Sequence, residues 1–231
     1  MANRPVFMVA KDNQFCQKIN VDFEYFSGFS EKQQRRCINS LHNSFKIIHP
    51  EKRVLEISSK SENELGVQLS AFNLFIKTKS GKEFSVESAF QGSKVFENGG
   101  PYIDLLSQTS RQAKKDMRLK NSGKLISFVY GGKTFPIEPK TYFYNWLYIN
   151  ALHLHLQLST EILNYDAFTD IAFNPQKSIN CQAEAAAIFV SLHKQGLLEK
   201  ALIDKDTFLD VVYPNHTKSN NNSVQLNIFD N

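Results

Sequence analysis

One short stretch of the sequence holds residue types that are able to do chemistry together. Glu87 is followed by Gln91 four residues later and by Lys94 seven residues later. In a helix this spacing places all three side chains on one face, which would also carry Phe90. A carboxylate transfers protons, and a lysine amine contacts an oxyanion or a sugar carbon. The pattern therefore indicates a catalytic pocket, although a solvated helix face has the same spacing.

Other kinds of active site find little support in the sequence. His153 and His155 are two residues apart on a predicted helix, so they lack the i, i+4 spacing of helical zinc ligands. The cysteines Cys16, Cys37 and Cys181 lie far apart, which argues against a disulfide framework and a zinc site. Cys181 stands near a predicted helix start, but a buried structural thiol is the favoured interpretation. We therefore expect neither a metal nor a cofactor.

The composition is that of a globular protein. Of the 231 residues, 42% are hydrophobic and 22% are charged, which is enough for a core and too apolar for a disordered chain. The sequence has no run of about 18 apolar residues, which excludes a transmembrane helix. The N-terminal residues also lack the apolar segment of a signal peptide. We therefore expect a cytoplasmic protein without a membrane partner.

The net charge of +4 is unevenly distributed along the chain. Residues 1–140 contain 22 Lys and Arg against 14 Asp and Glu, and residues 141–231 contain 5 against 9. The densest basic cluster extends from Arg111 to Lys133, with Asp116 as its acidic member. Such a cluster favours a phosphate-bearing partner, while a solvated helix and loop is the alternative interpretation.

The hydrophobic pattern predicts an α+β fold, a single domain dominated by helices with a few short strands. Ser30 is a suitable N-cap, and Gly131-Gly132 is typical of a hairpin turn. We predict helices over residues 31–45, 85–96, 102–115, 141–164 (with room for a break), 180–195 and 206–212. Strands are predicted near residues 7–10 and 54–57, and a hairpin over 73–85.

The string LSAFNLFIKTKSGKEFSVESAFQGSKVF, residues 69–96, resembles the opening signature of the NADAR (YbiA-like) family. That signature has a Leu-Ser-x-Phe element, a short β-turn-β, and then a Glu, a Gln and a Lys at the spacing found here. The segment DIAFN, residues 170–174, is similar to the family's Asp-x-x-Trp-Gly element, with Phe and Asn in place of Trp and Gly. Asn180 matches the Asn of its Gly-x-Asn-x-Leu-Gly element, whose flanking glycines are absent here.

Five further segments, among them ISSKSENELGVQLSAFNL and EPKTYFYNWLY, resemble one branch, the DarT-associated NADAR antitoxins, over residues 5–210. The resemblance implies a YbiA-like domain over residues 1–215, with an N-terminal extension of about residues 1–57. It implies an N-glycosidase that removes ADP-ribose from guanine bases in DNA. The partners would be ADP-ribosylated DNA and a DarT-type toxin, a DNA ADP-ribosyltransferase.

The resemblance also implies roles for individual residues. Glu87 would be the general acid or base, Lys94 an electrostatic stabiliser or transient nucleophile, and Asp170 a third catalytic residue. The remaining candidates would bind substrate: Ser70, Asn73 and Asn180 hold ADP-ribose, Lys114 and Arg118 contact phosphate, Phe90 and Trp146 stack on a base, and Phe72 and Gln91 complete the site.

Two other functions stay open. One is the N-glycosidic hydrolysis of riboflavin-pathway intermediates, which is another NADAR activity. The other is a non-catalytic antitoxin that occludes its toxin.

The last residues, 216–231, are predicted to be a flexible tail, because 218–223 are almost entirely Ser and Asn. Its end, with Gln225, Leu226, Ile228 and Phe229, resembles the peptide by which bacterial replication and repair proteins bind the sliding clamp. A segment that folds back on the domain is the equal alternative.

Overall fold

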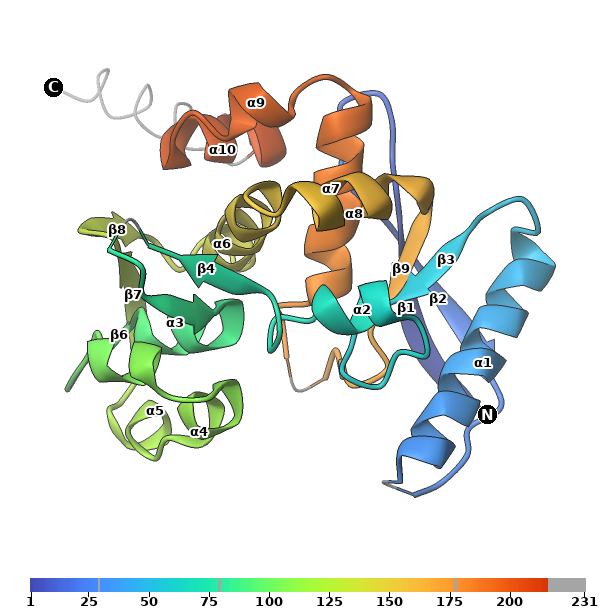
Figure 1. Cartoon of the computed structure of the whole chain (residues 1–231), viewed down its shortest axis with the longest axis horizontal. Coiled ribbons are helices and arrows are strands. Elements are labelled where there is room, and N and C mark those ends of the chain that lie inside the picture. Colours follow the sequence, from blue (N-terminus) through green and yellow to red (C-terminus); the bar gives the residue numbers. More distant parts are fainter. Residues whose placement is uncertain (29, 79, 177, 216–231) are drawn as a thin grey trace, which may run out of the picture.

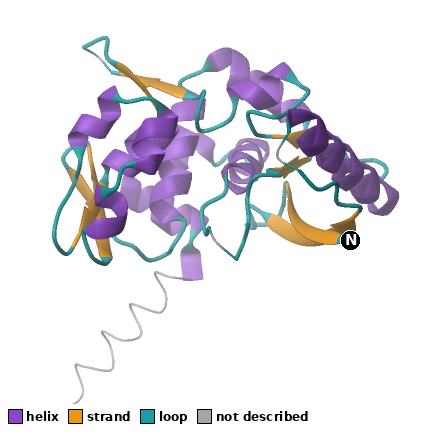
Figure 2. Cartoon of the chain, turned by 90° about the horizontal axis from the view of Figure 1, so that it is seen from below, coloured by secondary structure: helices purple, strands orange, loops and turns teal. Residues whose placement is uncertain are grey.

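Three small sheets surround a group of helices in the computed structural model, which describes residues 1–28, 30–78, 80–176 and 178–215 (Figures 1 and 2). The central helices lie between the four-stranded sheet and the three-stranded sheet, and further helices lie on the outside of the molecule. This is a mixed α+β single domain dominated by helices, which confirms the predicted fold class. Within the described part of the chain, no helix is long and apolar enough to cross a membrane. The predicted tail, residues 216–231, lies outside the described residues.

The four-stranded sheet joins the N-terminal segment to the middle of the chain. Its order is β2 (Gln17–Phe23), β1 (Ala2–Met8), β9 (Ala167–Thr169) and β3 (Val54–Glu56). β9 pairs antiparallel with β1 and parallel with β3. Strands were predicted near β1 and β3 but not at β2 and β9; the three residues of β9 are too few to show an alternating pattern.

Helix α1 (Glu31–Ile48) covers this sheet and buries Cys37, Leu41 and Phe45 against it. The side chain of Ser30 accepts a hydrogen bond from the Gln33 amide, so the predicted N-cap is confirmed. The helix continues three residues beyond the predicted end.

The main core is built on two central helices, α6 (Tyr142–His153) and α8 (Gln182–Lys194). The helical conformation is interrupted at Leu154–His155, and the chain continues as α7 (Leu156–Glu161) and the 3-10 helix η2 (Ile162–Asn164). The long helix predicted over 141–164 is therefore present with its break. Short helices α9 (Leu198–Ala201) and α10 (Lys205–Val212) pack on this core at the C-terminal side.

The remaining elements form a lobe on the other side of the central helices. Its members are the hairpin β4 (Phe75–Lys77) and β5 (Glu83–Ser85), α3 (Val86–Gly92), and a sheet of β6 (Lys94–Phe96), β7 (Leu125–Tyr130) and β8 (Lys133–Phe135). The exception is α2 (Glu64–Gln68), which lies beside β3 and α7. Between β6 and β7 lie η1 (Ile103–Ser107), α4 (Ser110–Lys115) and α5 (Arg118–Asn121). The β4–β5 hairpin and the β7–β8 turn at Gly131-Gly132, whose φ angles are 57° and 74°, are as predicted.

Two predicted helices are wrong in extent. The helix over 85–96 ends at Gly92, because Lys94 already pairs with Phe128 in the antiparallel β6–β7 ladder. The helix over 102–115 is divided at Thr109, which caps α4 through a capping box with Gln112. Lys94 therefore stands on a strand and does not share a helix face with Glu87.

Candidate active site

A cavity of about 690 Å³ opens between the α3 lobe and the segment that follows β9. This volume falls within the usual range for small-molecule sites, roughly 300–1,000 Å³. Its two walls differ in origin. The first wall comes from α3, the start of β6 and α4, and the second comes from residues 170–182 with the loop after β3.

Helix α3 places Glu87 in the first wall. Ser85 caps the helix by accepting from the Ser88 amide at 3.0 Å. The Glu87 amide then donates to the Ala71 carbonyl at 2.9 Å, which fixes the helix start against the loop after α2. The Glu87 side chain is buried and reaches the cavity.

The three residues singled out by their spacing form a hydrogen-bonded chain. Lys94 Nζ donates to Gln91 Oε1 at 2.7 Å, and Gln91 Nε2 donates to Glu87 Oε1 at 2.9 Å. Lys114 Nζ, from α4, lies 3.6 Å from the same Glu87 oxygen. The amide of Gln91 thus holds the amine and the carboxylate at a fixed separation, although Lys94 belongs to a strand.

Lys94 is an amine in a largely desolvated position. Burial lowers the pKa of Lys94 to about 8; the negative charge of Glu87 opposes this shift, and the positive charge of Lys114 adds to it. Near neutral pH a useful fraction of such an amine is unprotonated, which a nucleophile requires.

Each of the two lysine side chains of this wall lies over an aromatic ring. Lys94 Nζ lies 4.8 Å from the centre of the Phe90 ring, and Lys114 Nζ lies 5.2 Å from that of Phe72. Phe90 in turn packs edge-on against Tyr144, with 5.1 Å between ring centres. The rings therefore fix the positions of both amines.

The second wall presents Asp170, the first residue after β9. One of its carboxyl oxygens, Oδ1, accepts from the Ala172 amide at 3.0 Å. Burial, and then the negative charge of Glu56, raises the pKa of Asp170 above its usual value. A carboxyl group in this state is able to give up a proton near neutral pH.

Asn180 and Gln182 complete this wall. The Asn180 Oδ1 atom is buried and has no hydrogen-bond partner among the described residues, although its residue lines the cavity. Such an acceptor suits a ligand hydroxyl or N–H group. Gln182 donates to the Ile57 carbonyl at 2.6 Å and accepts from the Ala71 amide at 2.7 Å, so it joins the two walls.

The structure brings together nine of the twelve predicted pocket residues and leaves three outside. The nine are Ser70, Phe72, Glu87, Phe90, Gln91, Lys94, Lys114, Asp170 and Asn180. Asn73 does not line the cavity, because its side chain donates to the Val67 carbonyl. Trp146 packs on Tyr130 and Phe135, away from the cavity.

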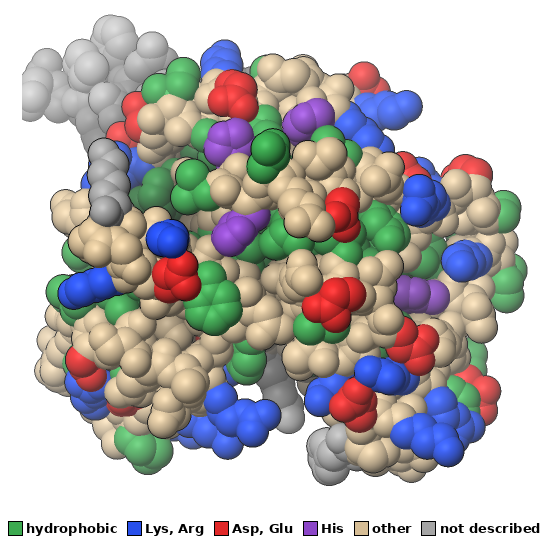
Figure 3. Space-filling model, viewed as in Figure 1, with side chains coloured by type: hydrophobic (Ala, Val, Ile, Leu, Met, Phe, Trp, Pro, Cys, Tyr) green, Lys and Arg blue, Asp and Glu red, His purple; other side chains and the backbone are tan. Residues whose placement is uncertain are grey.

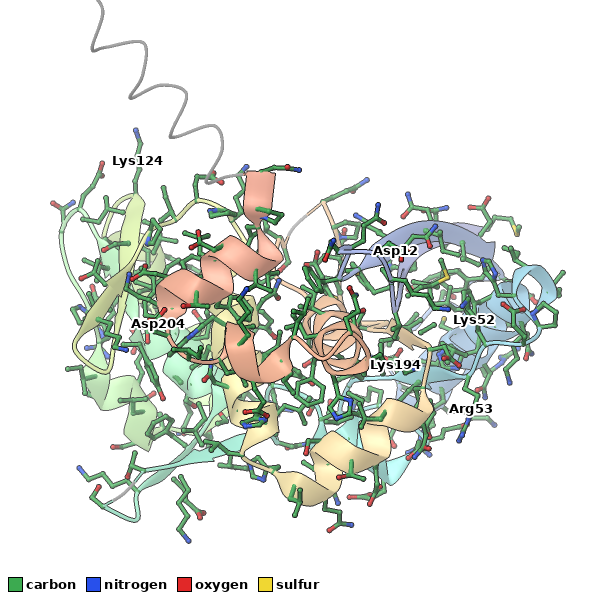
Figure 4. All side chains as sticks on the ribbon, turned by 90° about the horizontal axis from the view of Figure 1, so that it is seen from above. Asp12, Lys52, Arg53, Lys124, Lys194 and Asp204 are labelled. Atoms are coloured by element: carbon green, nitrogen blue, oxygen red, sulfur yellow. The ribbon has the colours of Figure 1, made fainter. Side chains whose placement is uncertain are left out.

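Arg118 also lies outside the cavity lining. Its guanidinium group makes ion pairs with Asp104 at 2.6 Å and with Asp116 at 3.0 Å. The basic cluster that contains it is spread over several elements, and Lys124 points outward on the side of the molecule opposite Lys52 and Arg53 (Figure 4). On the face drawn in Figure 3, basic and acidic side chains are interspersed. Lys114 is therefore the member of the cluster that reaches the cavity.

Sequence reasoning missed several cavity residues. Ile137 and Ile179 line the cavity and are 40% and 54% exposed, and Lys140 lines it from the same loop as Ile137. An isoleucine in a loop gives no periodic signal, and Lys140 stood apart from the charge cluster. Gln182 was also missed, because its bridging role depends on contacts between distant segments.

The fold and the site define a small α+β protein whose pocket combines two carboxyl groups, a desolvated amine and a basic rim. The chain matches the family described as DarT1-associated NADAR antitoxin over residues 2–222, and it belongs to that family. NADAR proteins are in general ADP-ribose glycohydrolases, and a member of this family removes from DNA the ADP-ribose that a DarT toxin attaches. A search of curated proteins gives no match.

Proposed function

We propose that this antitoxin is an N-glycosidase that releases ADP-ribose from ADP-ribosylated guanine in DNA, and that it acts in the cytoplasm, where its DNA substrate lies. The observation that carries the proposal is the Lys94–Gln91–Glu87 chain on one wall, with Asp170 on the other wall of the same cavity. The bond to be broken joins ribose C1″ to the exocyclic nitrogen of guanine. Water is consumed, guanine regains its N–H, and ADP-ribose leaves.

Glu87 acts as the general acid or base. A buried carboxylate beside a developing oxocarbenium centre stabilises positive charge and activates the water that attacks C1″. Gln91 fixes the carboxylate through its amide, and Lys114 lies close enough to Glu87 to limit where it moves. Asp170, on the opposite wall, protonates the departing guanine nitrogen.

Lys94 has two possible roles. As a nucleophile, its neutral amine bonds to C1″ while the bond to guanine breaks; the ribose ring then opens to an imine, and water releases ADP-ribose and regenerates the amine. As an electrostatic stabiliser, its ammonium form holds the ribose oxygens. Its pKa of about 8 leaves both forms populated near neutral pH.

The other residues that line the cavity bind the pyrophosphate, the ribose hydroxyls and the guanine base. Lys114 and Lys140 contact the pyrophosphate, and Asn180 accepts from a ribose hydroxyl. Ile137 and Ile179, at the exposed rim, contact the guanine base and the adjacent DNA strand. A base in a duplex must be flipped out to reach such a rim, so single-stranded DNA is the easier substrate.

The test is a direct comparison of substrates. Purified protein is incubated with an oligonucleotide carrying ADP-ribosylguanine and, separately, with riboflavin-pathway N-glycosides, and products are identified by mass spectrometry. The proposal expects free ADP-ribose and an unmodified oligonucleotide. Hydrolysis of the small N-glycosides alone would reject the DNA substrate.

A rescue assay in cells distinguishes an enzyme from an antitoxin that only occludes its toxin. Expression of the toxin with wild-type protein and with Glu87→Gln should show rescue by the wild type only. Equal rescue by the variant would favour occlusion of the toxin.

We also propose, from the sequence alone, that Gln225–Phe229 bind the sliding clamp. The matched comparison is clamp pull-down by the full chain and by a chain lacking residues 224–231. Retention by the full chain alone supports the proposal, and identical results for the two chains reject it.

A further inference from the structure

A second buried carboxyl group stands directly behind the pocket. Glu56, the last residue of β3, is 2% exposed and does not line the cavity. Its Oε2 accepts from the Thr169 hydroxyl at 2.6 Å, and its Oε1 accepts from the Ile171 amide at 2.9 Å. These donors belong to the residues immediately before and after Asp170. Glu56 therefore holds the backbone on both sides of the pocket carboxyl.

The strand pairing makes this contact possible. β3 and β9 run parallel, and Glu56 is the register partner of Thr169. Since β9 is also paired with β1, the N-terminal segment fixes β9 from its other edge. The position of Asp170 is thus set by a sheet whose strands are far apart in the sequence.

A histidine from α1 extends this network without adding charge. His42 Nε2 lies 2.8 Å from Thr169 Oγ1. The single hydroxyl hydrogen of Thr169 is used on Glu56, so His42 Nε2 must be the donor to Thr169. Burial, with Lys46 adding to it, lowers the pKa of His42 to about 4, which keeps the ring neutral near pH 7. Within the described residues, no Lys or Arg forms an ion pair with Glu56.

We propose that Glu56 is a positioning residue that sets both the orientation and the protonation of Asp170, and so keeps Asp170 available as the proton donor to the departing guanine. This inference rests on the proposed function. Glu56 itself touches no substrate.

Glu56 is a fully buried carboxyl group that acts on the half-buried carboxyl group of Asp170. Both cannot ionise easily, because each charge raises the free energy of the other. Burial raises the pKa of Glu56 as well, but its hydrogen bonds from Ile171 and Thr169 oppose that rise. Asp170 also accepts hydrogen bonds, but it carries in addition the repulsion of Glu56, so the negative charge of the pair lies on Glu56 and the proton on Asp170. Burial and the charge of Glu56 both raise the pKa of Asp170.

The other titratable groups near Asp170 do not supply this charge. Burial raises the pKa values of Tyr144 and Tyr148 on α6, and of Cys181 before α8, so these groups are neutral near pH 7. Gln182 contributes a neutral hydrogen bond to Asp170. The charged groups facing the cavity from α3, β6 and α4 are Glu87, Lys94 and Lys114. Glu56 on β3 is the charge that acts on Asp170 from behind.

The decisive variant is Glu56→Gln, which keeps the shape and an acceptor for Ile171 but removes the charge. Loss of a negative charge lowers the pKa of Asp170. The decline of kcat/KM with rising pH that reports the protonated form of Asp170 should therefore move to lower pH, by about one to three pH units. The assay uses full-length protein and an ADP-ribosylguanine oligonucleotide. In parallel, carbon-13 NMR follows the titration of the Asp170 carboxyl group itself.

Two further variants keep the test decisive. Glu184→Gln changes another carboxyl group, in the first turn of α8, whose pKa burial raises to about 7 and which does not line the cavity. It should leave the pH profile unchanged. Thr169→Val removes one donor to Glu56 while keeping side-chain shape, which makes the charged form of Glu56 less stable. It should move the Asp170 titration in the same direction as Glu56→Gln but less far, and it decides the question if Glu56→Gln does not fold.

The outcomes separate cleanly. A lower Asp170 pKa in the variants supports the proposal. An unchanged titration, whether kcat falls equally at every pH or not at all, overturns it and leaves Glu56 as a structural brace. If the wild type releases no ADP-ribose, the proposed function fails, and the NMR titration still decides whether Glu56 controls Asp170.

Discussion

The two walls of the cavity are built in opposite ways. In the first wall, Glu87, Gln91 and Lys94 come from eight consecutive residues, and their side chains are hydrogen-bonded directly to one another. The wall with Asp170 depends on a sheet in which β1, β3 and β9 come from distant parts of the chain. The first wall is therefore specified by local sequence, and the second by long-range pairing. The difference predicts that the walls respond differently to mutation.

The largest effect is expected from Glu87→Gln. The amide oxygen still accepts from Gln91, so the hydrogen-bonded chain persists, while the proton-transferring group is lost. Release of ADP-ribose from the modified oligonucleotide should fall by on the order of 10³-fold or more. Circular dichroism should match the wild type. Activity near the wild-type level would show that the first wall is not the catalytic one.

Lys94→Arg distinguishes the two roles of the lysine. An arginine keeps the positive charge but is never neutral, so the nucleophile role predicts a loss beyond about 10²-fold and the stabiliser role a loss within about tenfold. Borohydride should trap a protein–ADP-ribose adduct in the wild type under the nucleophile role. Absence of the adduct, with activity retained in Lys94→Arg, would contradict that role.

The pH dependence of wild-type kcat/KM also distinguishes the two roles of Lys94. Because the pKa of Lys94 is lowered to about 8, the neutral amine becomes the main form above that pH. A nucleophilic Lys94 makes its contribution to kcat/KM increase as pH rises through about 8, whereas a cationic stabiliser makes it decrease. Comparison with Lys94→Arg, which does not titrate in this range, isolates the contribution of Lys94.

Asp170→Asn tests the second wall. An amide fits the same place but cannot donate the proton of a carboxylic acid, so kcat should fall by on the order of 10²-fold. The binding of ADP-ribose, followed by calorimetry, should change little. A variant with unchanged kcat would remove Asp170 from the reaction and leave catalysis to the first wall alone.

The smallest effect is expected from Lys114→Ala. Its side chain is largely exposed, so loss of a phosphate contact should raise KM by about fivefold without a matching fall in kcat. Lys115→Ala, on the next residue of α4 and away from the cavity lining, is the matched control. Equal effects of the two substitutions would indicate general attraction of DNA and no contact in the pocket.

The same contrast explains how much the sequence predicted. The spacing of Glu87, Gln91 and Lys94 correctly predicted that their side chains lie together, although the helix predicted through Lys94 was wrong. Lys94 is only seven positions after Glu87, and β6 begins two residues after the end of α3. The side chains are therefore close whether residue 94 is helical or extended. The α+β class, the two hairpins and the interrupted central helix also followed from local patterns.

Long-range features escaped prediction. β9 is three residues long and carries no pattern of its own, yet it places Asp170. Nothing in the sequence around Glu56 distinguishes it from other residues of the predicted strand, because its hydrogen-bond partners lie more than 100 positions away. Arg118 was expected to bind phosphate; its neighbour Asp116 is visible in the sequence, but nothing local shows that Asp104, fourteen residues earlier, would also bind its side chain. Contacts of this kind exist only after the chain has folded.

The central claim is that the two walls act on one sugar, and a crystal structure of the Glu87→Gln variant with an ADP-ribosylated guanine nucleotide bound tests it most directly. The account predicts the ribose in contact with Lys94 Nζ, which lies about 3–3.5 Å from C1″ under the nucleophile role and on the ribose oxygens under the stabiliser role, with the Asp170 carboxyl within hydrogen-bond reach of the guanine nitrogen. A sugar that contacts one wall alone, or a ligand held outside the cavity, would contradict it.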